Sequence, residues 1–207
     1  MINFGTGAGT GANTGIQLDL TKSSTGIELD LTKQAGGQLN HVRFGGIFDP
    51  VMTGVDLDLD VSAFALQNGH LLSGSDVCFY NNMVVGNWMK HSIDARNGNV
   101  AQGDDEDEWI NIDLTSIPAN YDKIILLATI DQASSRSQTF GAVRTKVVLT
   151  DKDTNKKLTE VTLSNDYAMD SEVIIGSLDR KGAGWVFTAI GEGSLGKNIG
   201  VLANQYV

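Results

Sequence analysis

The feature that most constrains this chain is the run Val55–Val61, which reads Val-Asp-Leu-Asp-Leu-Asp-Val. Side chains along a strand alternate between two faces, so Asp56, Asp58 and Asp60 share one face and the leucines take the other. Three carboxylates in one row repel each other unless a cation lies over them. The run therefore predicts a strand with one apolar face and one strongly acidic face.

A second acidic run follows at residues 103–108, which read Gly-Asp-Asp-Glu-Asp-Glu. Hard divalent cations prefer oxygen ligands, and Ca²⁺ takes about 6–8 of them. Two acidic segments that converge in a β-rich chain would offer such a site. Spacing alone leaves two alternatives open: a calcium site, or a solvated strand face beside an acidic loop.

The charge balance excludes several classes of partner. Lys and Arg number 15 against 25 Asp and Glu, giving a net charge of −10. Phosphate backbones bind through basic side chains, so we expect no nucleic-acid partner. No apolar stretch approaches the roughly 20 residues that cross a bilayer, and no signal peptide is visible, so we expect no membrane insertion. A cytoplasmic location is expected, with a place inside an assembled particle as the alternative.

The residue types that carry catalysis are sparse. The single cysteine, Cys78, cannot form an intrachain disulfide and is expected to be a buried, inert thiol. The three histidines show no serine elbow and no metal-ligand spacing nearby, so they are expected at the surface. No nucleophile-and-base set emerges, and we expect a protein that is not an enzyme.

The start of the chain differs in composition from the rest. Residues 1–14 are rich in Gly and Thr and are expected to form a flexible N-terminal arm, with one domain over residues 15–207. Within that domain, residues 15–22 read Gly-Ile-Gln-Leu-Asp-Leu-Thr-Lys and return almost unchanged at residues 26–33. Each copy alternates apolar and polar residues, which predicts a duplicated half-buried edge strand or a swapped hairpin.

The remaining periodicity predicts an all-β fold, an antiparallel β-sandwich with a short C-terminal helix. Asn68-Gly69 predicts a tight hairpin turn, and the nearly all-apolar run 123–130 predicts a central strand covered on both faces. The helix is expected after Ser194 as its N-cap. Strands are expected at residues 39–48 with a break at Gly45-Gly46, and at 55–66, 77–80, 109–114, 123–130, 143–150, 158–163, 172–178 and 185–190.

A series of short motifs resembles one known family, the TerD-type tellurium-resistance and stress proteins. The doubled Leu-Asp-Leu-Thr-Lys is similar to that family's paired N-terminal strands. The resemblance continues collinearly from about residue 15 to the end of the chain. The matching motifs are residues 57–63 (Leu-Asp-Leu-Asp-Val-Ser-Ala), 79–82 (Phe-Tyr-Asn-Asn), 91–94 (His-Ser-Ile-Asp), 103–106, 117–119 (Ile-Pro-Ala), 137–144 (Ser-Gln-Thr-Phe-Gly-Ala-Val-Arg) and 185–187 (Trp-Val-Phe).

The resemblance implies a β-sandwich that holds one or two Ca²⁺ ions at one end through acidic loops. Its implied function is that of a non-catalytic calcium-binding module in a tellurite-resistance or general stress-response system. The alternative is a structural component of a large assembly, such as a phage particle or surface lattice, that uses the N-terminal arm for subunit contacts. Either role implies protein partners or self-association. The implied metal ligands are Asp58, Asp60, Asn81, Asp94, Asp104, Asp105 and Glu106.

Overall fold

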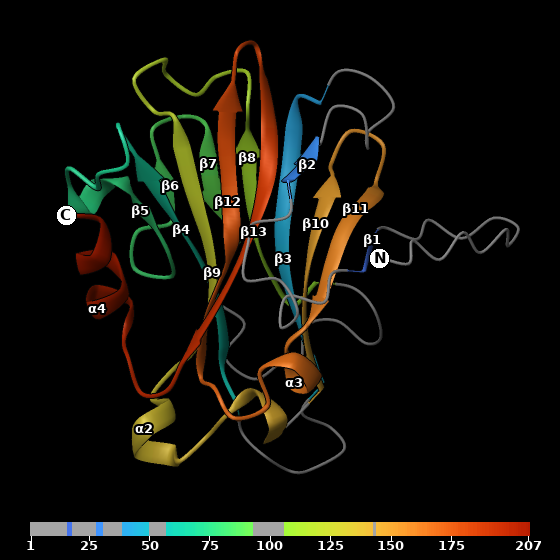
Figure 1. The fold of residues 1–207 in the computed structure, drawn as a ribbon, viewed down its shortest axis with the longest axis vertical. Helices are drawn as coiled ribbons and strands as arrows, with labels where there is room; N and C mark the ends of the chain where they lie inside the picture. Colours follow the sequence, from blue (N-terminus) through green and yellow to red (C-terminus); the bar gives the residue numbers. More distant parts are fainter. Residues whose placement is uncertain (1–15, 18–27, 31–38, 50–56, 93–105, 143) are drawn as a thin grey trace, which may run out of the picture.

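The computed structural model describes residues 16–17, 28–30, 39–49, 57–92, 106–142 and 144–207. Two sheets pack face to face (Figure 1), and the expected antiparallel β-sandwich with a short C-terminal helix is confirmed. The seven-stranded sheet has the order β1-β11-β10-β3-β8-β7-β6, and the six-stranded sheet has the order β2-β13-β12-β9-β4-β5. All pairings are antiparallel except β1 with β11.

The elements have the following bounds. The seven-stranded sheet contains β1 (Ile16–Gln17), β3 (His41–Asp49), β6 (Val84–Val85), β7 (Met89–His91), β8 (Glu108–Asp113), β10 (Arg144–Asp151) and β11 (Lys156–Thr162). The six-stranded sheet contains β2 (Glu28–Asp30), β4 (Leu59–Leu66), β5 (Val77–Cys78), β9 (Lys123–Ile130), β12 (Glu172–Lys181) and β13 (Gly184–Ser194). Short helices are η3 (Gly74–Asp76), α2 (Ala133–Arg136), η4 (Phe140–Ala142), α3 (Leu163–Asp166), α4 (Ile199–Ala203) and η5 (Asn204–Tyr206).

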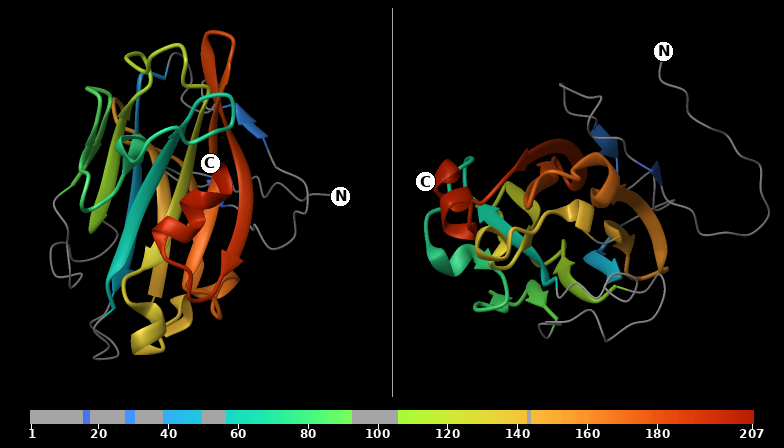
Figure 2. Two further views of the ribbon diagram at one scale, coloured as in Figure 1. Left: turned by 90° about the vertical axis from the view of Figure 1, so that its left-hand side faces the viewer. Right: turned by 90° about the horizontal axis from the view of Figure 1, so that it is seen from below.

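The main core fills the space between the sheets. Alternate residues of β4, including Leu59 and Val61, are fully buried there. Helix α4 lies over the outer face of the six-stranded sheet (Figure 2). A second apolar cluster, which includes Leu202 of α4, lies between this helix and the sheet. Strand β9 contributes to both clusters, Leu126 to the first and Leu127 to the second, which confirms a central strand covered on both faces.

The two copies of the repeated octad lie at the same side of the sandwich but in different sheets. The first copy contributes β1, which pairs in parallel with β11, and the second contributes β2, which pairs antiparallel with β13. Both are the terminal strands of their sheets, as expected for duplicated edge strands. The remainder of each octad lies outside the described residues.

Two local expectations are wrong. Strand β3 runs without a break through Gly45 and Gly46, because both glycines make room for close neighbours. A Cβ at Gly46 would lie 3.0 Å from Val61 Cγ1 of the facing sheet. The C-terminal helix is capped by Asn198, whose side chain accepts a hydrogen bond from Val201 N, because β13 continues as strand to Ser194.

The Asn68-Gly69 turn is confirmed. Both residues have positive φ, +53° and +81°, and a bridge joins Gln67 to His70 on either side of them. Positive φ at both central positions is the geometry that this dipeptide favours, and it returns the chain from β4 toward β5.

Candidate cation site

Two of the predicted ligands, Asp60 of β4 and Asp58 directly before it, lie on the outer face of the six-stranded sheet. Leu59 and Val61 point into the core, so the alternation directs Asp58 and Asp60 away from it. Asp60 is nevertheless only 6% exposed, and Asp58 is half-buried. Asp56 lies outside the described residues. A carboxylate that is buried on the outer face of a sheet requires polar or charged groups around it.

A polar row crosses the sheet at the level of Asp60. In register, Asp60 of β4 lies opposite Thr129 of β9, Thr129 lies opposite Glu172 of β12, and Glu172 lies opposite Ser194 of β13. Asp60 and Glu172 are both buried, at 6% and 1% exposure. Farther along the same face the row gives way to the apolar cluster beneath α4. The outer face of this sheet therefore has two parts, one lined by polar oxygen atoms and one apolar.

This oxygen-rich part opens into a cavity of about 360 Å³, which we call the acidic cavity. It lies between β4, the turn that connects β9 to α2, the start of β12 and the segment that precedes α4. Three carboxylates contribute to its wall, those of Asp60, Asp131 and Glu172, and Lys197 is exposed at its rim. The other lining residues are Ser62, Tyr80, Thr129, Ile130, Gln132, Ala133, Ser134, Ser135, Gly196, Asn198 and Ile199.

Hydroxyl groups hold the Glu172 carboxylate in place. Ser171 Oγ donates to Glu172 Oε1, and Ser194 Oγ donates to Oε2 at 3.1 Å. Ser171 Oγ also accepts from Gly196 N at 3.0 Å, which ties the C-terminal segment to the same group. Burial, together with the negative charge of Glu172, raises the pKa of neighbouring Asp170 above its ordinary value. This end of the sheet therefore has an electrostatic environment that disfavours further negative charge.

Between the sheets, a buried arrangement that we call the cross-sheet clamp binds β4 next to Asp60. Val61 N donates to Glu108 Oε2 at 3.3 Å, and His91 Nε2 lies 3.0 Å from Val61 O. His91 Nδ1 lies 2.9 Å from Ser92 O, so each ring nitrogen faces a carbonyl oxygen that only accepts. Glu108 Oε2 lies 3.8 Å from His91 Nε2, so the ring and the carboxylate are neighbours in the buried space between the sheets.

In the described part of the acidic run, residues 106–108, the three side chains lie in three different environments. Glu106 lies over Gly45 on the outer face of the seven-stranded sheet, where a Cβ would meet Glu106 Cγ at 2.2 Å, and its Oε2 is 3.9 Å from Arg43 Nη1. Asp107 Oδ2 accepts from Phe48 N at 2.9 Å. Glu108 points inward to the clamp. Residues 106–108 therefore connect β8 to both β3 and β4 through their side chains.

The predicted ligands are only partly brought together. Asp58 and Asp60 share one face, whereas Glu106 lies on the outer face of the opposite sheet, and Asn81 is exposed in the turn after β5. Asp94, Asp104 and Asp105 lie outside the described residues. Among the described residues, no group of three or more His, Cys, Asp or Glu side chains is placed to hold one ion. Carboxylate oxygens such as those of Asp58 and Asp60 are the ligand type that hard cations prefer.

Sequence reasoning missed four functional candidates. Glu172 and Asp131 line the acidic cavity, and only the strand register reveals their proximity to Asp60. His91 and Glu108 form the clamp, and the expectation that all three histidines are at the surface is wrong for His91, which is 1% exposed. A signal for Glu172 was present, since a glutamate that opens an apolar strand requires a partner when the strand is central.

The expectation for Cys78 is confirmed. It is fully buried, and burial raises the pKa of its thiol to about 12. The thiolate is the nucleophilic form, so this cysteine is inert at neutral pH. None of the helices within the described ranges is long and apolar enough to cross a membrane.

Comparison with known proteins identifies a matching family and several sequence relatives. The TerD domain model matches residues 16–206. The chain is 38% identical to general stress protein 16U of Bacillus subtilis (strain 168) over 146 residues, covering 69% of this chain and 74% of that protein. It is 36% identical to tellurium resistance protein TerD of Serratia marcescens over 156 residues, covering 74% and 79%.

A solved structure agrees in fold. The crystal structure of a homologue of telluride resistance protein (TerD) from Streptomyces coelicolor A3(2) superposes with a TM-score of 0.64 at 18% identity, covering 80% of this chain and 96% of that one. At this identity the likeness concerns the sandwich alone. The match of the family model over nearly the whole described chain, together with the sequence relatives, shows that the chain belongs to the TerD family.

Proposed function

We propose that this chain is a non-catalytic Ca²⁺-binding module that acts in a tellurium-resistance or general stress-response system. The names of its relatives, tellurium resistance protein TerD and general stress protein 16U, support the system. The single observation that supports cation binding is the burial of Asp60 in a cavity whose wall also carries Asp131 and Glu172. Buried carboxylates that face a common cavity favour a cation there.

In this proposal, Asp60 of β4 and Asp58, which directly precedes β4, supply ligands. Asn81, Asp94, Asp104, Asp105 and Glu106 are the further candidates, for one or two ions. A bound Ca²⁺ ion neutralises the carboxylates and joins the segments that carry them. The cross-sheet clamp holds the backbone of Val61, the residue next to Asp60, so that the two strand ligands keep their orientation.

A non-catalytic role is supported by the state of the reactive side chains. Cys78 is buried as a thiol, and His91 is enclosed between the sheets. His41 is the first residue of β3, and its Nδ1 lies 2.8 Å from Asp153 Oδ1 at the protein surface. The alternative function, a structural component of a large assembly, depends on the arm of residues 1–14, which lies outside the described residues.

Calorimetry on chelator-stripped protein tests the proposal. We expect uptake of one or two Ca²⁺ ions, and the absence of heat at millimolar Ca²⁺ would contradict it. Asp60→Ala and Asp104→Ala are each expected to abolish or weaken a site. Asp153→Ala is the matched control, since this aspartate lies in the loop between β10 and β11 beside His41. Equal loss from all three variants would indicate bulk charge rather than a site.

A further inference from the structure

The large apolar side chains that are most exposed gather in two segments. Among the described residues, all of them except Met169 come from residues 72–84 or 195–207. Leu72, Leu195 and Val207 are each more than 60% exposed. Scattered exposed apolar residues are normal, but a contiguous group on one surface indicates an interaction site.

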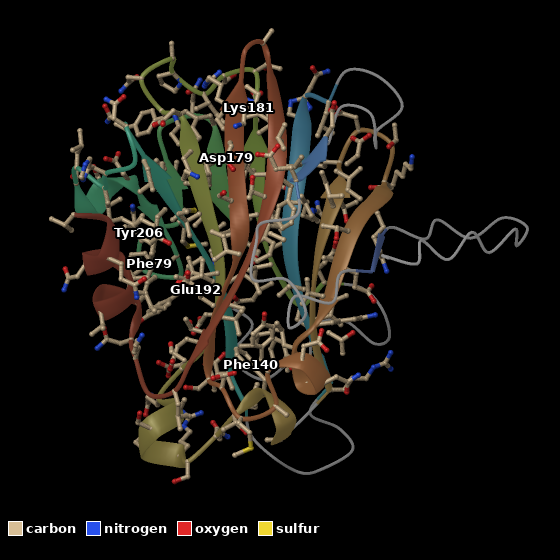
Figure 3. The ribbon with its side chains drawn as sticks, viewed as in Figure 1. Phe79, Phe140, Asp179, Lys181, Glu192 and Tyr206 are labelled. Atoms are coloured by element: carbon tan, nitrogen blue, oxygen red, sulfur yellow. The ribbon has the colours of Figure 1, made fainter. Side chains whose placement is uncertain are left out.

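The two segments are joined to each other and to the six-stranded sheet. Leu71 N donates to Tyr206 O at 2.6 Å, and the ring of Tyr206 packs edge-to-face on Phe64 with centroids 6.0 Å apart. Leu202 of α4 is buried in the cluster on the outer face of the sheet. The views agree that α4 lies beside β5 at one side of the sandwich (Figures 1 and 2), and Phe79 and Tyr206 mark this side in Figure 3.

Between the segments lies a groove of about 420 Å³, which we call the C-terminal groove. Most of its lining is apolar. Its residues are Leu71, Leu72, Ser73, Gly74, Val77, Phe79, Ile199, Gly200, Ala203, Asn204 and Val207. Because α4 is anchored through Leu202 on one face, Val201 is left to the solvent side at 46% exposure, and Val207, which follows η5, is 78% exposed.

This surface carries few charged side chains on a strongly acidic molecule. Exposed Glu192 of β13 lies at its edge, since burial together with the charge of Glu192 raises the pKa of Tyr206 to about 12 (Figure 3). The only charged residue between 71 and 85 is Asp76, which is buried and accepts from Tyr121 OH at 2.8 Å. The only charged side chain between 195 and 207 is Lys197. The chain as a whole carries −10, so two copies repel each other least where these uncharged surfaces meet. Depletion of charge at an apolar centre is also the compositional mark of protein interfaces.

We propose that the C-terminal groove and the exposed apolar residues around it form the interface between two copies of this chain. The same side of the sandwich also carries β5 and β6, the short terminal strands of the two sheets, which extend the surface. A two-fold dimer buries the same patch on both copies, so one uncharged surface suffices for both partners. The inference is independent of cation binding and goes beyond it.

Sedimentation equilibrium of the full chain over a concentration series tests this interface. We expect a reversible dimer, and Leu72→Glu and Val201→Glu, one from each segment, should each weaken it about thirtyfold or more because a charge is then desolvated in an apolar contact. Both side chains are exposed in the single chain, so melting of the dilute monomer should be unchanged. Met169→Glu is the matched control, because Met169 is 79% exposed but lies between α3 and β12.

Three results would overturn the proposal. The first is a wild-type chain that stays monomeric throughout the series. The second is a dimer that Leu72→Glu and Val201→Glu leave intact, which would place the interface elsewhere. The third is a loss of the dimer in Met169→Glu as large as in the other two variants, since association would then reflect general hydrophobicity.

Discussion

The outer face of the six-stranded sheet has a carboxylate group at each end, and the two ends are built differently. At the upper end in Figure 3, Asp179 forms an ion pair with Lys123 and accepts from Ser177 Oγ and Thr188 Oγ1, each at 2.7 Å. At the lower end, Asp60, Asp131 and Glu172 face the acidic cavity. Strand β12 carries members of both groups, and the apolar cluster beneath α4 separates them.

The pKa shifts at the two ends have opposite signs. Burial alone would raise the pKa of Asp179, but hydrogen bonds from Lys123, Thr188 and Ser177 outweigh it and lower that pKa. Burial and the charge of Glu172 raise the pKa of Asp170 at the lower end. The upper end contains its own cation, whereas Lys197 is the one basic side chain among the described residues that line the acidic cavity. This contrast supports the proposal that a cation from solution binds at the lower end.

The largest effect is expected from breaking the cross-sheet clamp. Glu108→Ala removes the buried carboxylate that lies 3.8 Å from His91 Nε2 and accepts a hydrogen bond from Val61 N. Removing one partner of a buried pair costs about 3–5 kcal/mol of unfolding free energy. Denaturant titration at neutral pH measures this loss.

Glu106→Ala is the matched control for the clamp, since it lies two residues away in the same acidic run. Its contact with Arg43 spans 3.9 Å on an outer face, so in cation-free protein, where its role as a candidate Ca²⁺ ligand has no effect, we expect a loss of unfolding free energy below about 1 kcal/mol. Equal losses from the two variants would mean that the clamp contributes no more than a surface pair.

Calcium should affect stability through the lower end alone. Binding to the native state adds about 2.7 kcal/mol at a hundredfold excess over Kd. For a chain of this size that corresponds to a rise in Tm of about 5–10 °C. We expect Asp60→Asn to reduce the rise and Asp179→Asn to retain it, although the latter variant melts lower throughout because Lys123 loses its partner.

Mg²⁺ should raise Tm less than Ca²⁺ does, because it requires a tight octahedral shell and releases water reluctantly. Identical melting in chelator and in millimolar Ca²⁺ would show that the lower end needs no cation. Retention of the full rise in Asp60→Asn would place any ion away from β4.

Much of the fold was predictable because periodicity reports which face of a strand is buried. The bounds of β9 agree with the expected run 123–130, and the alternation of Asp58 and Asp60 against Leu59 and Val61 is as predicted. The prediction of a break at Gly45-Gly46 is wrong because glycine can either mark a turn or allow close approach of a neighbour within a strand. Here it admits Glu106 on one face and Val61 on the other, which a single sequence does not distinguish from a turn.

The site was less predictable because it depends on contacts between distant strands. Glu172 follows Asp60 by more than a hundred residues, and only the register through Thr129 brings them onto one row. The two copies of the octad also show that sequence does not determine the neighbouring strand. Their sequences are nearly identical, yet one pairs in parallel and the other antiparallel. Strand patterns specify burial, whereas the choice of neighbour comes from the whole fold.

The smallest expected effects concern the titration of Asp179 and Asp170. The folded pKa of Asp179 is depressed, so its contribution to stability is present above the unfolded pKa of about 3.9 and is lost as pH falls through the folded value. The folded pKa of Asp170 is raised, so its contribution is present below the unfolded value and is lost as pH rises through the folded one. The two ends of the sheet thus respond to acid in opposite directions.

Carboxyl-carbon NMR titration of cation-free protein measures both groups at once. Glu172→Gln should bring the pKa of Asp170 down toward its ordinary value, because it removes the neighbouring charge and leaves only the effect of burial. Lys123→Met should raise the pKa of Asp179, since burial then acts without the cation. Each substitution should leave the other end unchanged, because the apolar cluster that contains Phe64, Leu127 and Ile174 lies between them. A change in the pKa of Asp179 in Glu172→Gln would show that the two ends are electrostatically coupled. The contrast between an upper end neutralised by Lys123 and a lower end proposed to bind a cation would then be wrong.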